Sequence, residues 1–348
     1  MRQNLWPNAL AKLCGAAYNK ATKSKDDKWG DNLRDAYGRE INYLRISVTD
    51  RCNLRCRYCM PAEGVVKKRH QDMLSLEHLL EIAQAAVALG VRKIRLTGGE
   101  PLVRRGVVGL VEALAQIPEV EDLSMTTNGI LLPQFAPALK AAGLKRLNLS
   151  LDTLRPERYA AMTRLGSLEE ALAGFRAALA EGFSPIKVNA VLIGGFNDDE
   201  IPDLVGLTER YPIEMRFIEL MPMGHAVFPP EAYLPAERVL EAVPSLTPLP
   251  EEMGTARLYQ LPGAPGRVGL ISPLSRHFCG SCNRIRLTAD GFLKPCLHGA
   301  EEISVASLHG TALTEALRTV IAHKPPCHDR LAWDSPSKSI RTMNEIGG

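Results

Sequence analysis

The run Val48-Thr-Asp-Arg-Cys-Asn-Leu-Arg-Cys-Arg-Tyr-Cys-Met-Pro61 places three cysteines, Cys52, Cys56 and Cys59, at the spacing C-x3-C-x2-C. A cubane iron–sulfur cluster normally takes four thiolates, so three at one tight spacing predict a cluster whose fourth iron is open to a substrate or cofactor. An open iron indicates catalysis rather than electron storage. The alternatives are a disulfide pair and a zinc knuckle, whose other ligands would come from a distant segment.

With Tyr58 before its last cysteine and Met-Pro after it, this run resembles the signature of the radical S-adenosylmethionine (SAM) family. The resemblance implies a [4Fe-4S] cluster on the three cysteines and SAM bound to the open iron. It also places Tyr58 among the cofactor-binding residues. A loop suits this task, because the thiolates must converge on one cluster while the backbone bends around a nucleoside-sized ligand.

A second group of three cysteines lies far downstream, where Cys279 and Cys282 are followed by Cys296. Taken alone, this C-x2-C-x13-C pattern also suits a structural zinc site that His277 or His298 would complete. Beside the first triad, a second cluster with an open iron is favoured. The pattern, with Arg284 and Arg286 just behind it, resembles the GTP 3′,8-cyclase family of molybdenum-cofactor biosynthesis. The resemblance runs from about Leu33 to Gly348.

Short β-rich runs alternate with helical patterns through the first two thirds of the chain. The expected strands are Tyr43–Val48, Lys93–Thr97, Leu123–Thr127, Arg146–Leu151, Ile186–Ile193 and Met215–Leu220. The expected helices are Leu76–Leu89, Val107–Gln116, Gln134–Ala142, Leu168–Glu181 and Ile201–Arg210. Right-handed βα crossovers build a parallel sheet, and six units resemble the α/β partial (β/α)6 TIM-like barrel of the radical SAM family.

Polar motifs follow four successive strands, at the edge where parallel sheets bind ligands. They are the cysteine run, Gly98-Gly-Glu-Pro101, Thr126-Thr-Asn-Gly129 and Ser150-Leu-Asp152. Each alone could be a turn, but glycines also allow a ligand close to the backbone. The resemblance assigns Gly99 and Glu100 to the amino group of SAM, and Ser150 and Met221 to the walls of its pocket.

Basic residues recur along the same expected strands: Arg45, Lys93, Arg95, Lys187 and Arg216. Salt bridges would explain any one of them. Because Lys and Arg are seldom buried unpaired, the set favours a polyanionic ligand. The resemblance assigns the last four to the phosphates or ribose of GTP and places Arg45 near the reacting ribose. It adds substrate contacts at Thr126, Arg284 and Arg286.

After Gly224 prolines become frequent, and short strands are expected at Arg257–Gln260 and Val268–Ile271, with a helix at Thr311–His323. We expect residues 33–223 to form the barrel and residues 224–348 to form a separate layer that carries the second cluster and closes the open side. The chain ends in Gly347-Gly348. A frayed terminus would suit glycines, but the resemblance gives both a catalytic role, with the tail reaching the active site near Arg45.

Residues 1–32 lie outside the resemblance, and apolar residues from Leu5 to Tyr18 recur at helical spacing, so a helix or a disordered tail is expected there.

The clustered cysteines indicate a reducing, cytoplasmic compartment, and Cys14 and Cys327 receive no role. The net charge of +3 and an aromatic content of 5% argue against nucleic-acid binding. No apolar run is long enough to cross a membrane. Oligomeric state is left open, with a homodimer as one form.

The resemblance implies that a SAM-derived 5′-deoxyadenosyl radical takes the C3′ hydrogen of GTP and that the C3′ radical attacks C8. The product is (8S)-3′,8-cyclo-7,8-dihydroguanosine 5′-triphosphate. A low-potential electron donor and a downstream pterin-forming enzyme are the implied partners. Two alternatives remain: a radical SAM peptide maturase with an auxiliary cluster, and a non-enzymatic zinc protein that binds RNA or a partner.

Overall fold

Six parallel strands alternate with helices in the computed structural model, which describes residues 33–65, 68–224, 228–252, 254–332 and 334–347. The strands are β1 (Tyr43–Ser47), β2 (Lys93–Thr97), β3 (Asp122–Thr127), β4 (Arg146–Ser150), β5 (Ile186–Leu192) and β6 (Ile213–Glu219). The helices are α2 (Leu76–Ala88), α3 (Val107–Ala115), α4 (Leu132–Ala141), α5 (Pro156–Thr163), α6 (Leu168–Ala180) and α7 (Ile201–Arg210). The predicted α/β partial barrel is confirmed, and α5 was not predicted.

Local sequence explains where these helices begin. The Ser75 hydroxyl accepts a hydrogen bond from the backbone N–H of His78 and so caps α2. At α6, Ser167 and Glu170 form a reciprocal capping box. Such caps satisfy backbone donors that have no partner within the helix. The expected helix and Cys14 within residues 1–32 lie outside the described residues.

The C-terminal part does not form the separate layer that we expected; it continues the barrel sheet at both edges. Beyond β6 follow β9 (Arg267–Ile271), β8 (Arg257–Gln260) and β7 (Thr247–Pro248). Beyond β1 follow β10 (Arg284–Leu287), β11 (Phe292–Lys294) and β12 (Ile303–Ser304). Both β9 and β10 run parallel to their barrel neighbours. An open six-stranded barrel would leave unpaired backbone groups along β1 and β6, and these strands satisfy them.

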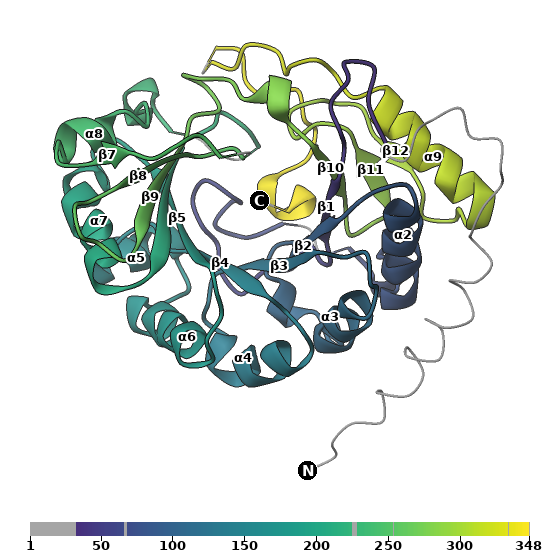
Figure 1. Cartoon of the computed structure of the whole chain (residues 1–348), viewed down its shortest axis with the longest axis horizontal. Helices are drawn as coiled ribbons and strands as arrows, with labels where there is room; N and C mark the ends of the chain where they lie inside the picture. Colours follow the sequence, from purple (N-terminus) through teal and green to yellow (C-terminus); the bar gives the residue numbers. More distant parts are fainter. Residues whose placement is uncertain (1–32, 66–67, 225–227, 253, 333, 348) are drawn as a thin grey trace.

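The helices cover the outside of this curved sheet, and the C-terminal tail turns into its middle (Figure 1). The remaining helices are α8 (Arg238–Ala242), α9 (Gly310–Ala322) and α10 (Met343–Ile346). Short 3-10 helices span His70–Asp72, Pro101–Val103, Asp198–Glu200, Pro230–Ala232 and Cys279–Ser281. Among the described residues, no helix has the length and apolarity that crossing a membrane requires.

The alternation along each strand separates the core from the site. Leu44, Ile46 and Ile94 are fully buried in the main hydrophobic core. The intervening Arg45 and Arg95 line the central cavity instead. Because neighbouring residues of a strand point to opposite faces, one face packs apolar side chains and the other presents cations to a ligand.

Candidate active site

One cavity of about 300 Å³ is lined by both cysteine triads. Cys52, Cys56 and Cys59 come from the loop after β1. Cys279 and Cys282 precede β10, and Cys296 follows β11. All six cysteines are free thiols and partly buried. Two sets of three soft sulfur donors in one cavity fit two iron–sulfur clusters, each with one iron left for a further ligand.

The electrostatic surroundings of the two triads differ. Burial raises the pKa of the Cys52 thiol to about 11 and that of Cys59 to about 12. Burial acts the same way on Cys282, but the neighbouring cations Arg284 and Lys324 outweigh it and bring its pKa to about 6. A metal ligand must be a thiolate. Cys282 is therefore already disposed to ionise, whereas metal binding must displace the protons of Cys52 and Cys59.

Gly98 and Gly99 pack directly beneath the first cysteine loop. The N–H of Gly99 donates to the carbonyl of Thr49 at 2.8 Å, and a Cβ added at Gly99 would lie 2.6 Å from the carbonyl carbon of Arg51. Only glycine fits there without moving the loop. Gly99 also lines the cavity, as expected of a cofactor contact.

Of the other residues expected to contact SAM, three line the cavity and one does not. Ser150, Met221 and Tyr58 line the cavity, and the Tyr58 hydroxyl donates to Asp152 at 2.9 Å. Glu100 does not line it. Its side chain is 1% exposed and accepts hydrogen bonds from the N–H of Leu102, the N–H of Asn128 and the hydroxyl of Thr127.

Burial raises the pKa of Glu100 to about 7 despite these three bonds. In this arrangement the Glu100 carboxylate holds the loops after β2 and β3 together. Three bonds leave part of the acceptor capacity of a carboxylate unused, so the binding of the SAM amino group by Glu100 stays a prediction.

Three arginines form a row across adjacent strands. Arg45 on β1 stands in register with Arg286 on β10 and with Arg95 on β2. All three side chains are buried and line the cavity. Burial, together with Arg286 and Arg95, holds the pKa of Arg45 well below its ordinary value. Like charges placed this closely disfavour one another, so the row favours an anionic ligand.

A second cationic group surrounds one buried carboxylate. Glu214 is 2% exposed and contacts Arg216, Lys187 at 3.3 Å and Arg267 at 3.1 Å. Burial, followed by the charge of Arg216, lowers the pKa of Lys187 to about 8. Arg216 lines the cavity, as do Thr126 and Arg284.

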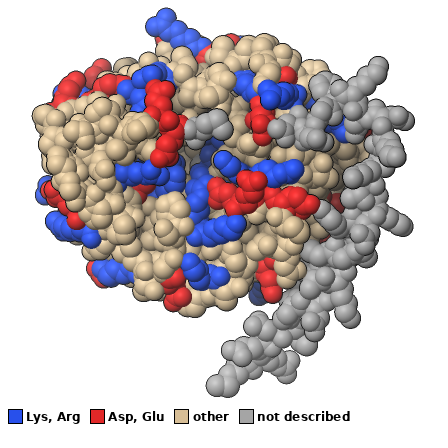
Figure 2. Space-filling view, in the orientation of Figure 1, with Lys and Arg blue, Asp and Glu red and all other residues tan. Residues whose placement is uncertain are grey.

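Two predicted substrate residues, Lys93 and Lys187, are not among the cavity-lining residues. Lys93 is the first residue of β2 and so lies at the amino end of the strand. Lys187 is turned toward Glu214. Figure 2 shows Lys and Arg side chains gathered around the hollow at the centre of this face.

The C-terminal tail reaches the arginine row. The carbonyl of Gly347 accepts a hydrogen bond from Nη1 of Arg286 at 2.7 Å. Its φ is +80°, and an added Cβ would overlap Oγ1 of Thr97. Glycine alone combines that backbone conformation with that close approach. The other predicted tail residue, Gly348, lies outside the described residues.

Several polar cavity residues escaped the sequence analysis. Asn148 Nδ2 and Asn189 Oδ1, with Oγ1 of the expected Thr126, have no hydrogen-bond partner among the residues that the structure describes. Buried polar atoms are usually paired, so these atoms suit a polar ligand. Asn148 precedes Ser150 by two residues and Asn189 follows Lys187 by two, so strand alternation could have revealed both.

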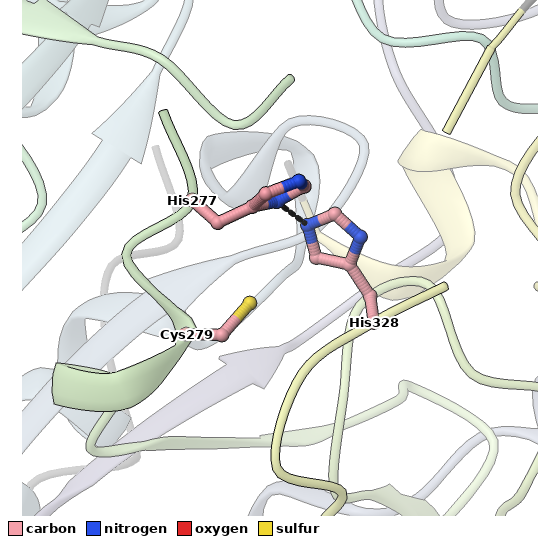
Figure 3. A group of neighbouring side chains, drawn as sticks. All are labelled: His277, Cys279 and His328. Atoms are coloured by element: carbon pink, nitrogen blue, oxygen red, sulfur yellow. Dashed lines mark hydrogen bonds between the residues drawn. The ribbon is translucent and has the colours of Figure 1, made fainter. Parts of the chain in front are cut away.

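The zinc alternative has one structural counterpart. His277, Cys279 and His328 offer ligand atoms within 4.8 Å of one another, and His277 Nδ1 lies 3.2 Å from His328 Nε2 (Figure 3). His298 instead approaches the hydroxyl of Ser337 with its Nδ1, at 3.2 Å. Because Cys279 also belongs to the second triad, one thiolate cannot serve a separate zinc site and a cluster independently.

Comparison with known proteins covers nearly the whole chain. A model of the Radical SAM superfamily matches residues 46–208, and one described as Molybdenum Cofactor Synthesis C matches residues 213–330. The GTP 3′,8-cyclase of Alkaliphilus oremlandii (strain OhILAs) is 50% identical over 321 residues, 91% of this chain and 100% of that protein. The GTP 3′,8-cyclase of Peptoclostridium acidaminophilum is 51% identical over 322 residues, 91% and 98% of the two chains.

Solved structures share the fold at low sequence identity. Streptococcus suis SuiB aligns with a TM-score of 0.59 and 16% identity over 83% of this chain and 68% of its own. Native anSMEcpe with bound AdoMet aligns with a TM-score of 0.57 and 14% identity over 88% and 93%. These two likenesses show a shared fold and carry no information on the substrate.

Proposed function

This chain belongs to the GTP 3′,8-cyclase family of radical SAM enzymes, and on that basis we infer that its cavity binds GTP beside SAM and two [4Fe-4S] clusters. Cys52, Cys56 and Cys59 would hold the SAM-binding cluster. The second triad, Cys279, Cys282 and Cys296, would hold the auxiliary cluster. We propose that the functional division follows these triads, with residues 33–223 serving SAM and residues 224–348 the auxiliary cluster.

When bound, SAM and its cluster would supply a 5′-deoxyadenosyl radical able to take the C3′ hydrogen of GTP, after which C3′ would bond to C8. The protein must therefore hold the ribose and base of GTP in one orientation and exclude water from the reacting atoms. Holding reactants in a productive geometry can account for about 7–11 kcal/mol of a barrier.

The row of Arg45, Arg95 and Arg286 is the observation that carries the substrate proposal. Three buried guanidinium groups offer planar, multidentate donors to phosphate oxygens. A triphosphate would also relieve their mutual repulsion. We propose that Arg216 and Arg284 complete this binding surface. Lys187, which contacts the same carboxylate as Arg216, would add a positive charge close to this surface.

The tail would act through Arg286. Because the Gly347 carbonyl accepts from Nη1 of Arg286, it fixes the direction in which that guanidinium presents its remaining donors. Asn344 anchors the same segment by donating to the carbonyl of Asp50 at 3.0 Å, and Ile346 is fully buried. We propose that the tail orients the substrate and covers the ribose.

Two partners follow from the same proposal. A low-potential electron donor would deliver two electrons per turnover: one for SAM cleavage and one that, with a proton, quenches the purine radical left when C3′ bonds to C8. A pterin-forming enzyme would consume the cyclised nucleotide.

The experiment is anaerobic reconstitution with iron and sulfide, followed by reduction and incubation with SAM and GTP. We expect 5′-deoxyadenosine and a cyclised GTP product together. Arg95→Gln should lose GTP conversion, whereas Arg176→Gln, on an exposed arginine paired with Glu169, should retain it. 5′-Deoxyadenosine without GTP conversion would move the substrate to a peptide, and colourless zinc-loaded protein without either product would overturn the radical SAM account.

A further inference from the structure

Outside the cavity, His78, Glu81 and His309 converge where α2 meets the segment that leads into α9. One potential ligand atom of each lies within 4.8 Å of the others. Glu81 Oε2 is 3.0 Å from His78 Nδ1 and 2.7 Å from His309 Nδ1. The two helices lie side by side in Figure 1 and contact each other. The cavity is lined by other residues.

The orientation of His78 leaves one nitrogen for a cation. Its Nε2 lies 3.1 Å from the backbone carbonyl of Val305, which can only accept, so Nε2 carries the proton. In the neutral ring Nδ1 then presents a lone pair, and it faces Glu81 Oε2, another acceptor. Metal-binding histidines typically donate their second ring N–H to a carbonyl or carboxylate in this way. His78 is 9% exposed, so this orientation is held by packing.

The carboxylate supplies the charge that a cation needs. Oε2 of Glu81 faces a ring nitrogen of both histidines. His78 and Glu81 are three residues apart on α2, which puts both on one face of the helix. In metal-binding helical bundles a glutamate and a histidine three residues apart, there in the reverse order Glu-x-x-His, bind one metal site.

We propose that His78, Glu81 and His309 bind one divalent transition-metal ion of the zinc class. Imidazole and carboxylate are ligands that suit Zn²⁺, and three protein ligands leave the fourth position to water. Tetrahedral zinc with bonds of 2.0–2.1 Å holds its ligand atoms about 3.3 Å apart. The two contacts to Glu81, 3.0 and 2.7 Å, need to widen by tenths of an ångström, and the nitrogens of the two histidines, which lie within 4.8 Å of each other, must reach the same separation. The side chain of His309 is 66% exposed and can make that adjustment.

Such an ion would join the two parts of the chain that supply the two triads. Glu81 and His309 are 228 residues apart. α2 connects the first cysteine loop to β2, whereas His309 follows β12, which lies beyond β10 at the edge where the C-terminal strands meet β1. The metal would fix this seam, and with it the separation of the two cysteine triads. The His277, Cys279 and His328 group does not offer the same opportunity, since Cys279 is needed by the second triad.

The test uses the full chain with both clusters loaded, incubated anaerobically with Zn²⁺ alone and freed of loose metal by desalting. We expect one zinc ion per chain by elemental analysis, with X-ray absorption showing only nitrogen and oxygen neighbours near 2.0 Å. Glu81→Gln and His309→Ala should lose this ion while retaining their iron. His323→Ala changes an exposed histidine elsewhere on the same helix and should retain the zinc.

Two results would overturn the proposal. Sulfur neighbours near 2.3 Å would place the zinc on cysteines. Failure of wild-type protein to retain zinc would mean that Glu81 only bridges the two histidines by hydrogen bonds. A thermal scan gives an independent readout: Zn²⁺ should raise the midpoint of wild type and of His323→Ala, but not that of His309→Ala.

Discussion

Replacing Gly347 with alanine tests whether the tail orients Arg286. The new Cβ would overlap Oγ1 of Thr97 and lie 2.9 Å from its Cβ and 3.3 Å from the N–H nitrogen of Gly98. Thr97 is 1% exposed and cannot retreat, so the tail must move and the 2.7 Å bond between Arg286 and the Gly347 carbonyl must lengthen. A hydrogen bond to a charged group contributes about 1.5–3 kcal/mol. If that energy is used in the transition state, the turnover rate falls about 10- to 150-fold.

The assay measures cyclised GTP product and 5′-deoxyadenosine in the same anaerobic reaction, with iron and sulfide content measured alongside. Both clusters should remain, because the substitution touches no cysteine. Gly263→Ala is the matched control, since Gly263 has a φ of +75° but no atom within 4 Å of an added Cβ. Wild-type turnover in Gly347→Ala, or equal losses in the two variants, would refute the reasoning.

Three further predictions concern charge and cluster loading. The Kd for GTP should rise about five-fold between pH 7 and pH 9 if bound phosphate raises the pKa of Lys187 by one unit from about 8. Kd rises with pH because bound phosphate favours protonated Lys187: the affinity is full below pH 8 and is lost as pH rises through the raised pKa of Lys187 in the complex. Lys187→Arg should flatten the dependence of Kd on pH. The same slope in wild type and Lys187→Arg would contradict this prediction. Glu214→Gln should lower the free energy of unfolding by about 3–5 kcal/mol, because it leaves buried cations without their carboxylate. Denaturant unfolding checks this, with Glu252→Gln, the exposed second partner of Arg267, as a near-neutral control. Cys56→Ser and Cys282→Ser should each lose about four iron atoms per chain. Cys56→Ser should also abolish 5′-deoxyadenosine formation, whereas Cys282→Ser should lose mainly the cyclised product; identical effects on both products would contradict separate roles.

Sequence reasoning succeeded where local pattern determines structure. The strand Lys93–Thr97 and the helix Ile201–Arg210 have the predicted bounds, because alternation and helical periodicity are clear and turn residues bound them. Cysteine spacing likewise predicted which thiols gather in the cavity. Each of these features depends on residues close together in the chain.

Sequence reasoning failed where contacts between distant segments determine the structure. The strand Arg284–Leu287 pairs with β1, some 240 residues earlier, and its four residues give no local sign of that partner. The C-terminal strands were therefore expected as a separate layer. Nothing near Glu100 in the sequence indicates that the hydroxyl of Thr127, 27 residues away, donates to its carboxylate. Register and burial, which no single segment specifies, decide both outcomes.

The most direct test of the central claim follows the hydrogen atom that leaves C3′ of GTP. GTP carrying deuterium at C3′ would be incubated anaerobically with SAM, reductant and the reconstituted protein, and the 5′-deoxyadenosine analysed by mass spectrometry. The account predicts that the 5′-deoxyadenosine gains one mass unit and that a cyclised nucleotide forms with it. Unlabelled 5′-deoxyadenosine, with GTP recovered intact, would show that this cavity generates the radical for a different substrate.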